Sequence, residues 1–144
     1  MTGSPPLSDE PLSDEPLART PCVLLLAAVC EVIAHTRCDL TTEVATQDGI
    51  QAALRGEEVG LAVEISREHR LGPGDRPDFL IDGRIVVEVK GRRHRGPAVL
   101  RQLERYAAHP QVEAIVLATS RAMTMPAQIG GKPVRVLNLG RAWL

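Results

Sequence analysis

Residues 76–91, RPDFLIDGRIVVEVKG, decide how the middle of this chain folds. Two runs rich in Ile and Val flank an Asp-Gly dipeptide at positions 82 and 83, which is a strong signal for a β-hairpin. The hairpin carries Asp78 on its first strand and Glu88 and Lys90 on its second. Two carboxylates beside one ammonium group form a place that suits a divalent cation next to a phosphate, because Mg²⁺ prefers oxygen ligands.

The register of the hairpin decides whether these side chains meet. With a strict two-residue turn, Asp78 would lie opposite Val87, and Glu88 would point to the other face of the sheet. A three-residue loop over residues 82–84 shifts the pairing by one, so that Asp78 faces Glu88 and Lys90 lies one step further along the same face. We therefore expect either this loop or a bulge on the strands before Glu88.

The Glu-Val-Lys tripeptide is a weak signal when it stands alone. Alternating charges and valines are typical of any strand with one solvent-facing side, and lysine also protects the edges of sheets. Lysine is nevertheless uncommon in this chain, since only Lys90 and Lys132 among its 17 basic residues are lysines. A structural role and a catalytic role for these charges therefore both stay open at this point.

Charge is distributed unevenly along the chain. Its 144 residues suit one domain with a hydrophobic core, and the net charge of −1 indicates no particular partner. The segment 84–105, however, carries seven basic residues against two glutamates. Such a patch suits a phosphate backbone, although a solvated helix face would have the same composition. The three aromatic residues are too few for the stacking platforms that bind single-stranded nucleic acid.

The N-terminal part of the chain differs in composition from the rest. Residues 1–21 contain the segment LSDEP twice and predict a disordered acidic tail, before a single domain over residues 22–144. The apolar run Cys22–Ala34 follows acidic residues and is too short to span a bilayer, which favours a packed helix over a signal peptide. The three cysteines lack metal-binding spacing and fit reduced thiols in a cytoplasmic protein with no membrane partner.

The rest of the chain predicts an alternation of helices and strands. Besides the hairpin, we expect helices over residues 43–55 and 98–108 and strands over residues 59–67, 113–119 and 134–139. The order from residue 43 is helix, three strands, helix, strand and one extra strand. This order predicts an α/β fold with a mixed sheet and helices on its faces.

The order of elements and the motif together resemble the PD-(D/E)xK nuclease superfamily. The residues that carry the resemblance are Pro77-Asp78 and Glu88-Val89-Lys90. The resemblance implies a restriction-endonuclease-like core, α-β-β-β-α-β, over residues 42–139, with an extra N-terminal helix and an extra C-terminal strand. RecB-type members carry Gln-x-x-x-Tyr on the helix after the lysine, as this chain does from Gln102 to Tyr106. The VRR-NUC and Holliday-junction-resolvase branches are also similar, and the branch stays open.

The resemblance implies a nuclease that hydrolyses phosphodiester bonds of DNA with Mg²⁺ or Mn²⁺, endonuclease action being favoured. It assigns Asp78, Glu88 and the Val89 carbonyl to the metal, with no iron–sulfur cluster. Lys90 would position or deprotonate the attacking water. Glu43 is either a further metal ligand or a first-turn acid that the positive helix N-terminus stabilises.

The same resemblance predicts the contacts with DNA and leaves other functions open. Phosphates would be bound by Arg92, Arg93 and Arg95. Gln102 and Tyr106 would orient the strand or a metal-bound water, although Tyr106 also suits a core position. A homodimer is expected by analogy with small nucleases. The alternatives are a non-catalytic DNA-binding or assembly subunit of the same fold and an unrelated α/β domain whose charges face solvent.

Overall fold

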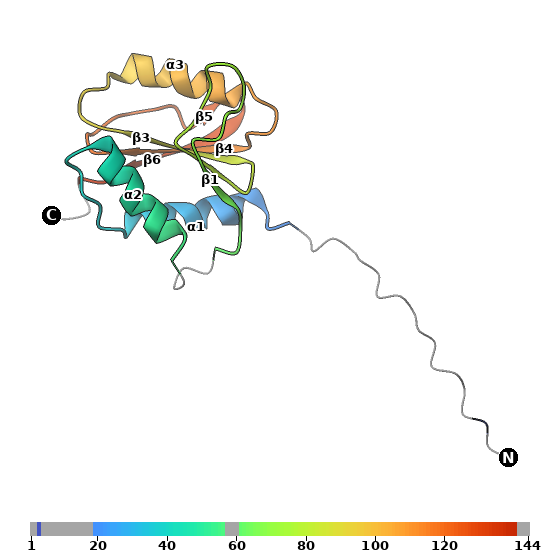
Figure 1. The fold of residues 1–144 in the computed structure, drawn as a ribbon. Helices are drawn as coiled ribbons and strands as arrows, with labels where there is room; N and C mark the ends of the chain where they lie inside the picture. The colour runs from blue at the N-terminus through green and yellow to red at the C-terminus, as the bar shows by residue number, and fades with distance from the viewer. Residues whose placement is uncertain (1–2, 4–18, 57–60, 141–144) are drawn as a thin grey trace.

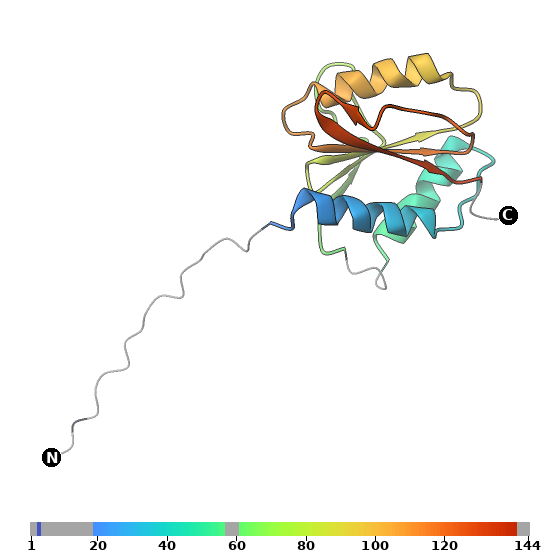
Figure 2. The ribbon, with the colours of Figure 1, turned by 180° about the vertical axis from the view of Figure 1, so that it is seen from behind.

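The computed structural model describes residues 3, 19–56 and 61–140. A mixed six-stranded sheet lies between two helical layers, with α3 on one face and α1 and α2 on the other (Figure 1). Seen from behind, α1 runs along the sheet on the side opposite α3 (Figure 2). The α/β class with a mixed sheet is therefore confirmed. Three predictions fall on residues outside the described part of the chain: the tail at residues 1–2 and 4–18, the start of the strand predicted at residue 59, and the chain end at residues 141–144.

The bounds of the elements follow the sequence patterns closely. They are α1 (Cys22–Ala34), α2 (Glu43–Leu54), β1 (Ile65–Arg67), β2 (Phe79–Ile81), β3 (Ile85–Lys90), α3 (Gly96–Ala107), β4 (Ala114–Thr119), β5 (Gln128–Ile129) and β6 (Lys132–Asn138). The Thr42 hydroxyl accepts a hydrogen bond from the Ala45 amide and so caps the start of α2. Pro97 occupies the first turn of α3, where its missing amide hydrogen costs nothing.

The sheet has the strand order β1-β2-β3-β4-β6-β5. The strands β1, β2 and β3 form an antiparallel meander, and α3 then connects β3 to β4, which runs parallel to it. The strand β6 is parallel to β4, and the short β5 pairs antiparallel with β6. From α2 onwards, the succession of helix, three strands, helix and strand is the one that the sequence predicts.

Two strand predictions were wrong in extent. Of the strand predicted over residues 59–67, the described residues 61–64 are irregular and only Ile65 to Arg67 pair with β2. The sequence predicts no strand between residues 119 and 134, where the structure has β5, which forms a hairpin with β6. The turn of this hairpin is Gly130-Gly131, with φ angles of 58° and 76° that glycine adopts without strain.

Alternation along β3 decides which side chains reach which face. Ile85, Val87 and Val89 belong to the core beneath α1 and α2, whereas Val86 belongs to the core beneath α3. Because successive side chains of a strand point to opposite faces, Glu88 falls on the α3 side together with Val86. On the other face, α1 buries Leu25, Leu26, Val29 and Ile33, as a packed helix should. No helix among the described residues is long and apolar enough to cross a membrane.

Candidate active site

The hairpin has the register that brings the acidic residues together. Phe79 pairs with Val87, Leu80 with Val86 and Ile81 with Ile85, so the connecting loop is three residues long, which is the first of the two predicted arrangements. Asp82 and Gly83 have φ angles of 53° and 69°, and the Arg84 amide donates to the Ile81 carbonyl at 3.0 Å. Arg84 is therefore the extra residue that shifts the register by one relative to a two-residue turn.

The carboxylates of Asp78 and Glu88 each accept a hydrogen bond from a backbone amide across the hairpin. The Asp78 amide donates to Glu88 Oε2 at 3.2 Å, and the Val89 amide donates to Asp78 Oδ2 at 2.7 Å. Each carboxylate is thus held by the backbone of the opposite strand. The two acidic groups lie on one face of the hairpin, as the three-residue loop requires.

A lysine, a tyrosine and a glutamine complete the surroundings of Glu88. Lys90 Nζ lies 3.3 Å from Glu88 Oε1, and both side chains are largely buried. The Tyr106 hydroxyl accepts a hydrogen bond from Gln102 Nε2 at 2.9 Å, and burial together with the neighbouring Glu88 raises the pKa of Tyr106. Tyr106 is 1% exposed, so its ring is part of the core and only its hydroxyl serves the site. The predicted contact between Tyr106 and a nucleic-acid strand has no exposed surface to support it.

Burial makes this carboxylate pair electrostatically costly. Desolvation and the neighbouring Asp78 charge raise the pKa of Glu88 to about 7, against the lowering effect of Lys90. Burial also raises the pKa of Asp78, while its hydrogen bond from Val89 and the Lys90 charge oppose the rise. Two buried carboxylates with one ammonium group carry an excess negative charge that a bound cation would offset. Strongly perturbed pKa values of this kind are frequent at functional sites.

Glu43 lies near this pair but has partners of its own. Its Oε1 accepts a hydrogen bond from the Gly91 amide at 2.9 Å and is also bonded to His94 Nε2. The charge of Glu43 still raises the pKa of Asp78. Within the described part of the chain, no three or more His, Cys, Asp or Glu side chains are grouped to hold a metal ion. The site therefore offers two carboxylates, which is the usual number of protein carboxylates around Mg²⁺.

Sequence reasoning missed two residues beside the carboxylates. His94 lies in the loop after β3, where its Nε2 is bonded to Glu43, and no spacing of histidines in the sequence signals this contact. Glu68 lies next to Asp78. Its amide donates to the Asp78 carbonyl at 2.9 Å, and its charge contributes to the raised pKa of Asp78. The positive φ of Glu68, 55°, marks a turn after β1 that the Glu-His-Arg sequence does not signal.

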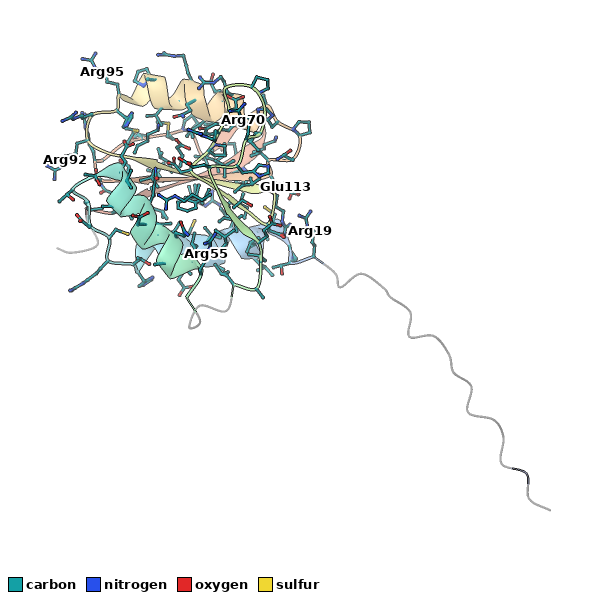
Figure 3. All side chains as sticks on the ribbon, in the orientation of Figure 1. Arg19, Arg55, Arg70, Arg92, Arg95 and Glu113 are labelled. Atoms are coloured by element: carbon teal, nitrogen blue, oxygen red, sulfur yellow. The ribbon has the colours of Figure 1, made fainter. Side chains whose placement is uncertain are left out.

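The basic patch is narrower than the sequence indicates. Arg84 is 5% exposed, and its guanidinium contacts Asp82 and the Thr20 carbonyl. It therefore stabilises the fold and is not part of the exposed basic patch. Arg92, Arg93 and Arg95 are exposed in the loop after β3. Arg92 and Arg95 lie at the end of the molecule where β3 leads into α3, whereas Arg70 and Arg19 lie toward the other end (Figure 3).

A cavity of about 630 Å³ opens beside this loop. Its walls come from the start of α2, the end of β3 and the loop that follows, and they include Glu43, Lys90 and His94. Lys90 thus faces this cavity and also contacts Glu88. The carboxylate pair and the cavity lie at the same end of β3.

Comparisons with protein-family models, curated proteins and solved structures find no match to this chain.

Proposed function

We propose that this protein is a metal-dependent nuclease that hydrolyses phosphodiester bonds of DNA. The observation that carries the proposal is the buried pair of Asp78 and Glu88, joined across the hairpin and contacted by Lys90. A carboxylate pair left without a counter-charge would destabilise the fold, so its retention inside the protein needs a reason. A divalent cation at this position supplies that reason.

The arrangement of elements supports a restriction-endonuclease-like core. In the described structure, α2 precedes the antiparallel meander β1-β2-β3, and α3 leads to β4 parallel to β3. Asp78 directly precedes β2, and Glu88 and Lys90 end β3, which are the places that the PD-(D/E)xK resemblance requires. In this proposal, α1 and the β5-β6 hairpin are additions around that core.

The protein groups that would hold Mg²⁺ or Mn²⁺ are the carboxylates of Asp78 and Glu88 and the Val89 carbonyl. A cation there would lower the pKa of a bound water and offset the negative charge that develops on the phosphate. Glu43 would act from outside this set, since its Oε1 is bonded to Gly91 and His94. We therefore assign Glu43 an electrostatic contribution to the site.

Three side chains of the site have roles that follow from their contacts. Lys90 Nζ, held 3.3 Å from Glu88, would orient the attacking water and stabilise the charge on the phosphate. The Tyr106 hydroxyl, fixed by Gln102, would keep the Glu88 carboxylate in one orientation. Arg92, Arg93 and Arg95 would bind flanking phosphates and provide affinity that depends on salt and not on base sequence.

Incubation of the full-length protein with supercoiled plasmid and Mg²⁺ or Mn²⁺ tests the proposal. We expect nicked or linear products that disappear with EDTA and in the Lys90→Ala variant. Calorimetry with Mn²⁺ should show that Lys90→Ala still binds the metal, because the two carboxylates remain. Arg101→Ala, which removes an exposed charge from α3, is the matched control and should cut like the wild type.

The outcome also separates the proposed nuclease from a non-catalytic subunit of the same fold. Plasmid binding without cleavage at any metal concentration would favour the subunit. Cleavage by Lys90→Ala at the wild-type rate would contradict the site. Formation of a homodimer stays a prediction, which light scattering of the purified protein would test.

A further inference from the structure

The cavity beside the carboxylate pair has the size and the lining of a ligand site. Its volume of about 630 Å³ lies within the range of roughly 300–1,000 Å³ that small-molecule sites occupy. Thr42, Glu43 and Thr46 contribute from α2, and Val89 and Lys90 contribute from the end of β3. Because Lys90 faces both the cavity and Glu88, a group bound here would adjoin the reaction centre.

The chemistry of the walls is mixed in a way that suits a nucleotide. Arg92 and Arg93 line the cavity, and within the described residues their guanidinium groups form no ion pair or hydrogen bond. They are therefore free to bind a phosphate. Leu40 offers an apolar surface for a base. The Thr42 hydroxyl accepts from the Ala45 amide and keeps its own proton, which it can donate to a sugar.

The one acidic wall residue, Glu43, is held in place on two sides. Gly91 donates its amide to Glu43 Oε1 at 2.9 Å, and His94 Nε2 contacts the same atom. A Cβ added at Gly91 would come within 3.4 Å of Glu43, so the backbone approaches this side chain closely. Glu43 Oε2, which has no hydrogen bond among the described residues, remains as an acceptor for a base or sugar donor.

We infer that this cavity is a subsite for one unpaired nucleotide of the DNA strand, next to the phosphate that is cut. The inference rests on the proposed nuclease function and names its substrate class. A base that is stacked in continuous duplex cannot enter a cavity unless it leaves the stack, which costs free energy. DNA with overhangs, flaps or gaps already presents such a nucleotide and is the preferred substrate.

Titration of the full-length protein with 2′-deoxyadenosine 5′-monophosphate in EDTA tests the subsite without any cleavage. In amide NMR spectra we expect shifts confined to the cavity walls, at residues 40–43, 46, 89–94 and 120. Deoxyadenosine and inorganic phosphate are titrated in parallel, and each should bind more weakly than the nucleotide. Equal binding of inorganic phosphate and the nucleotide would overturn the inference, because it would indicate an anion site alone.

Variants separate a defined pocket from general attraction by positive charge. Arg92→Ala/Arg93→Ala should weaken nucleotide binding at least about tenfold through lost charged hydrogen bonds. Arg70→Ala/Arg101→Ala removes the same amount of charge from exposed positions outside the cavity and should leave nucleotide binding unchanged. Ser120→Leu fills the cavity without altering charge and should abolish binding while the melting temperature shows an intact fold. Equal losses in the two double variants would overturn the inference.

A cleavage panel compares blunt duplex with overhang, flap and gapped DNA. We expect the substrates with an unpaired nucleotide to be cut faster by the wild type, and Ser120→Leu to lose that preference. Equal rates on all substrates would overturn the subsite while leaving the nuclease intact. Nucleotide binding without cleavage of any DNA would instead contradict the proposed function and leave the subsite as a plain nucleotide site.

Discussion

At the scale of single residues, Glu88 has the most unfavourable environment for a charged carboxylate in the site. The residue is 3% exposed and its carboxylate lies beside Asp78. Burial and the Asp78 charge together raise the pKa of Glu88 from 4.5 to about 7. Above this pKa the folded protein must hold a buried negative charge that the unfolded chain exposes to water. One pKa unit corresponds to about 1.4 kcal/mol, so the charge costs on the order of 3 kcal/mol of folding stability.

We predict that Glu88→Gln stabilises the metal-free protein at pH 8. The unfolded chain loses the proton of Glu88 near pH 4.5, whereas the folded protein retains it until about pH 7. Stability of the wild type therefore falls as pH rises between these values, and this loss is absent from the variant. Denaturant unfolding in EDTA at several pH values between 4.5 and 8 measures the difference, which should grow with pH and then level off.

The control for this prediction is Glu104→Gln, which removes an exposed carboxylate from α3. Its stability should follow that of the wild type at every pH. A Glu88→Gln variant that is less stable than the wild type at pH 8 would contradict the predicted cost of burying the Glu88 charge. Added Mn²⁺ should stabilise the wild type more than Glu88→Gln, because the amide is a poorer ligand.

At the scale of elements, the hairpin turn sets the register on which the site depends. Gly83 has a φ of 69°, and an added Cβ would meet only the end of the Arg19 side chain at 3.9 Å. The obstacle to a larger residue is therefore the backbone conformation, which costs an L-residue about 1–2 kcal/mol. Space around the turn is not limiting.

We predict that Gly83→Ala lowers the free energy of unfolding by about 1 kcal/mol and keeps the register. Gly96→Ala is the matched control, because Gly96 starts α3 without a positive φ and a Cβ there meets nothing within 4 Å. Chemical denaturation of both variants beside the wild type makes the measurement. Equal stability of Gly83→Ala and the wild type would indicate that the turn is less constrained than its φ angles indicate.

The loop between β3 and α3 is the second element with a functional consequence. We predict that replacing Arg92, Arg93 and Arg95 by Ala weakens DNA binding and makes it less dependent on salt. Each lost phosphate contact changes the slope of log affinity against log salt by about 0.9, so the triple variant should lose about 2–3 units. Fluorescence anisotropy at several salt concentrations measures the slope, and an unchanged slope would move the DNA path to another surface.

At the scale of the whole molecule, the domain begins before α1. Arg19 Nη2 donates to the Asp82 carbonyl at 2.6 Å, and Arg84 contacts the Thr20 carbonyl. These contacts connect the segment before α1 to the hairpin turn more than 60 positions later. The sequence prediction placed the tail at residues 1–21 on composition alone, which cannot register such contacts.

We predict that a chain starting at Arg19 melts like the full-length protein. A chain starting at Cys22 loses the Thr20 carbonyl that Arg84 contacts and leaves part of a buried guanidinium unpaired. The cost of such a group is about 1–3 kcal/mol. Thermal unfolding of the two truncations at equal concentration distinguishes them, and an identical melting temperature would show that Arg84 finds other partners.

The sequence by itself determined the elements and the faces of the hairpin. An apolar run predicted the first helix, apolar periodicity predicted the other two, and Asp-Gly between β-branched runs predicted a hairpin turn at residues 82 and 83, with either a three-residue loop or a bulge. The alternation of a strand then required Asp78 and Glu88 to share a face once the loop had three residues. All of this depends on neighbours within about a dozen positions, for which local sequence is sufficient information.

Only the tertiary structure decided what surrounds these residues. The pairing of Glu43 with His94, the burial of Arg84 and the contact of the Tyr106 hydroxyl with Glu88 each join separate elements. The cavity likewise exists because the start of α2 packs beside the end of β3. The physical reason is that packing depends on how whole faces of helices and sheet fit together. The sequence does not reveal which charged side chains become buried or which distant groups they contact.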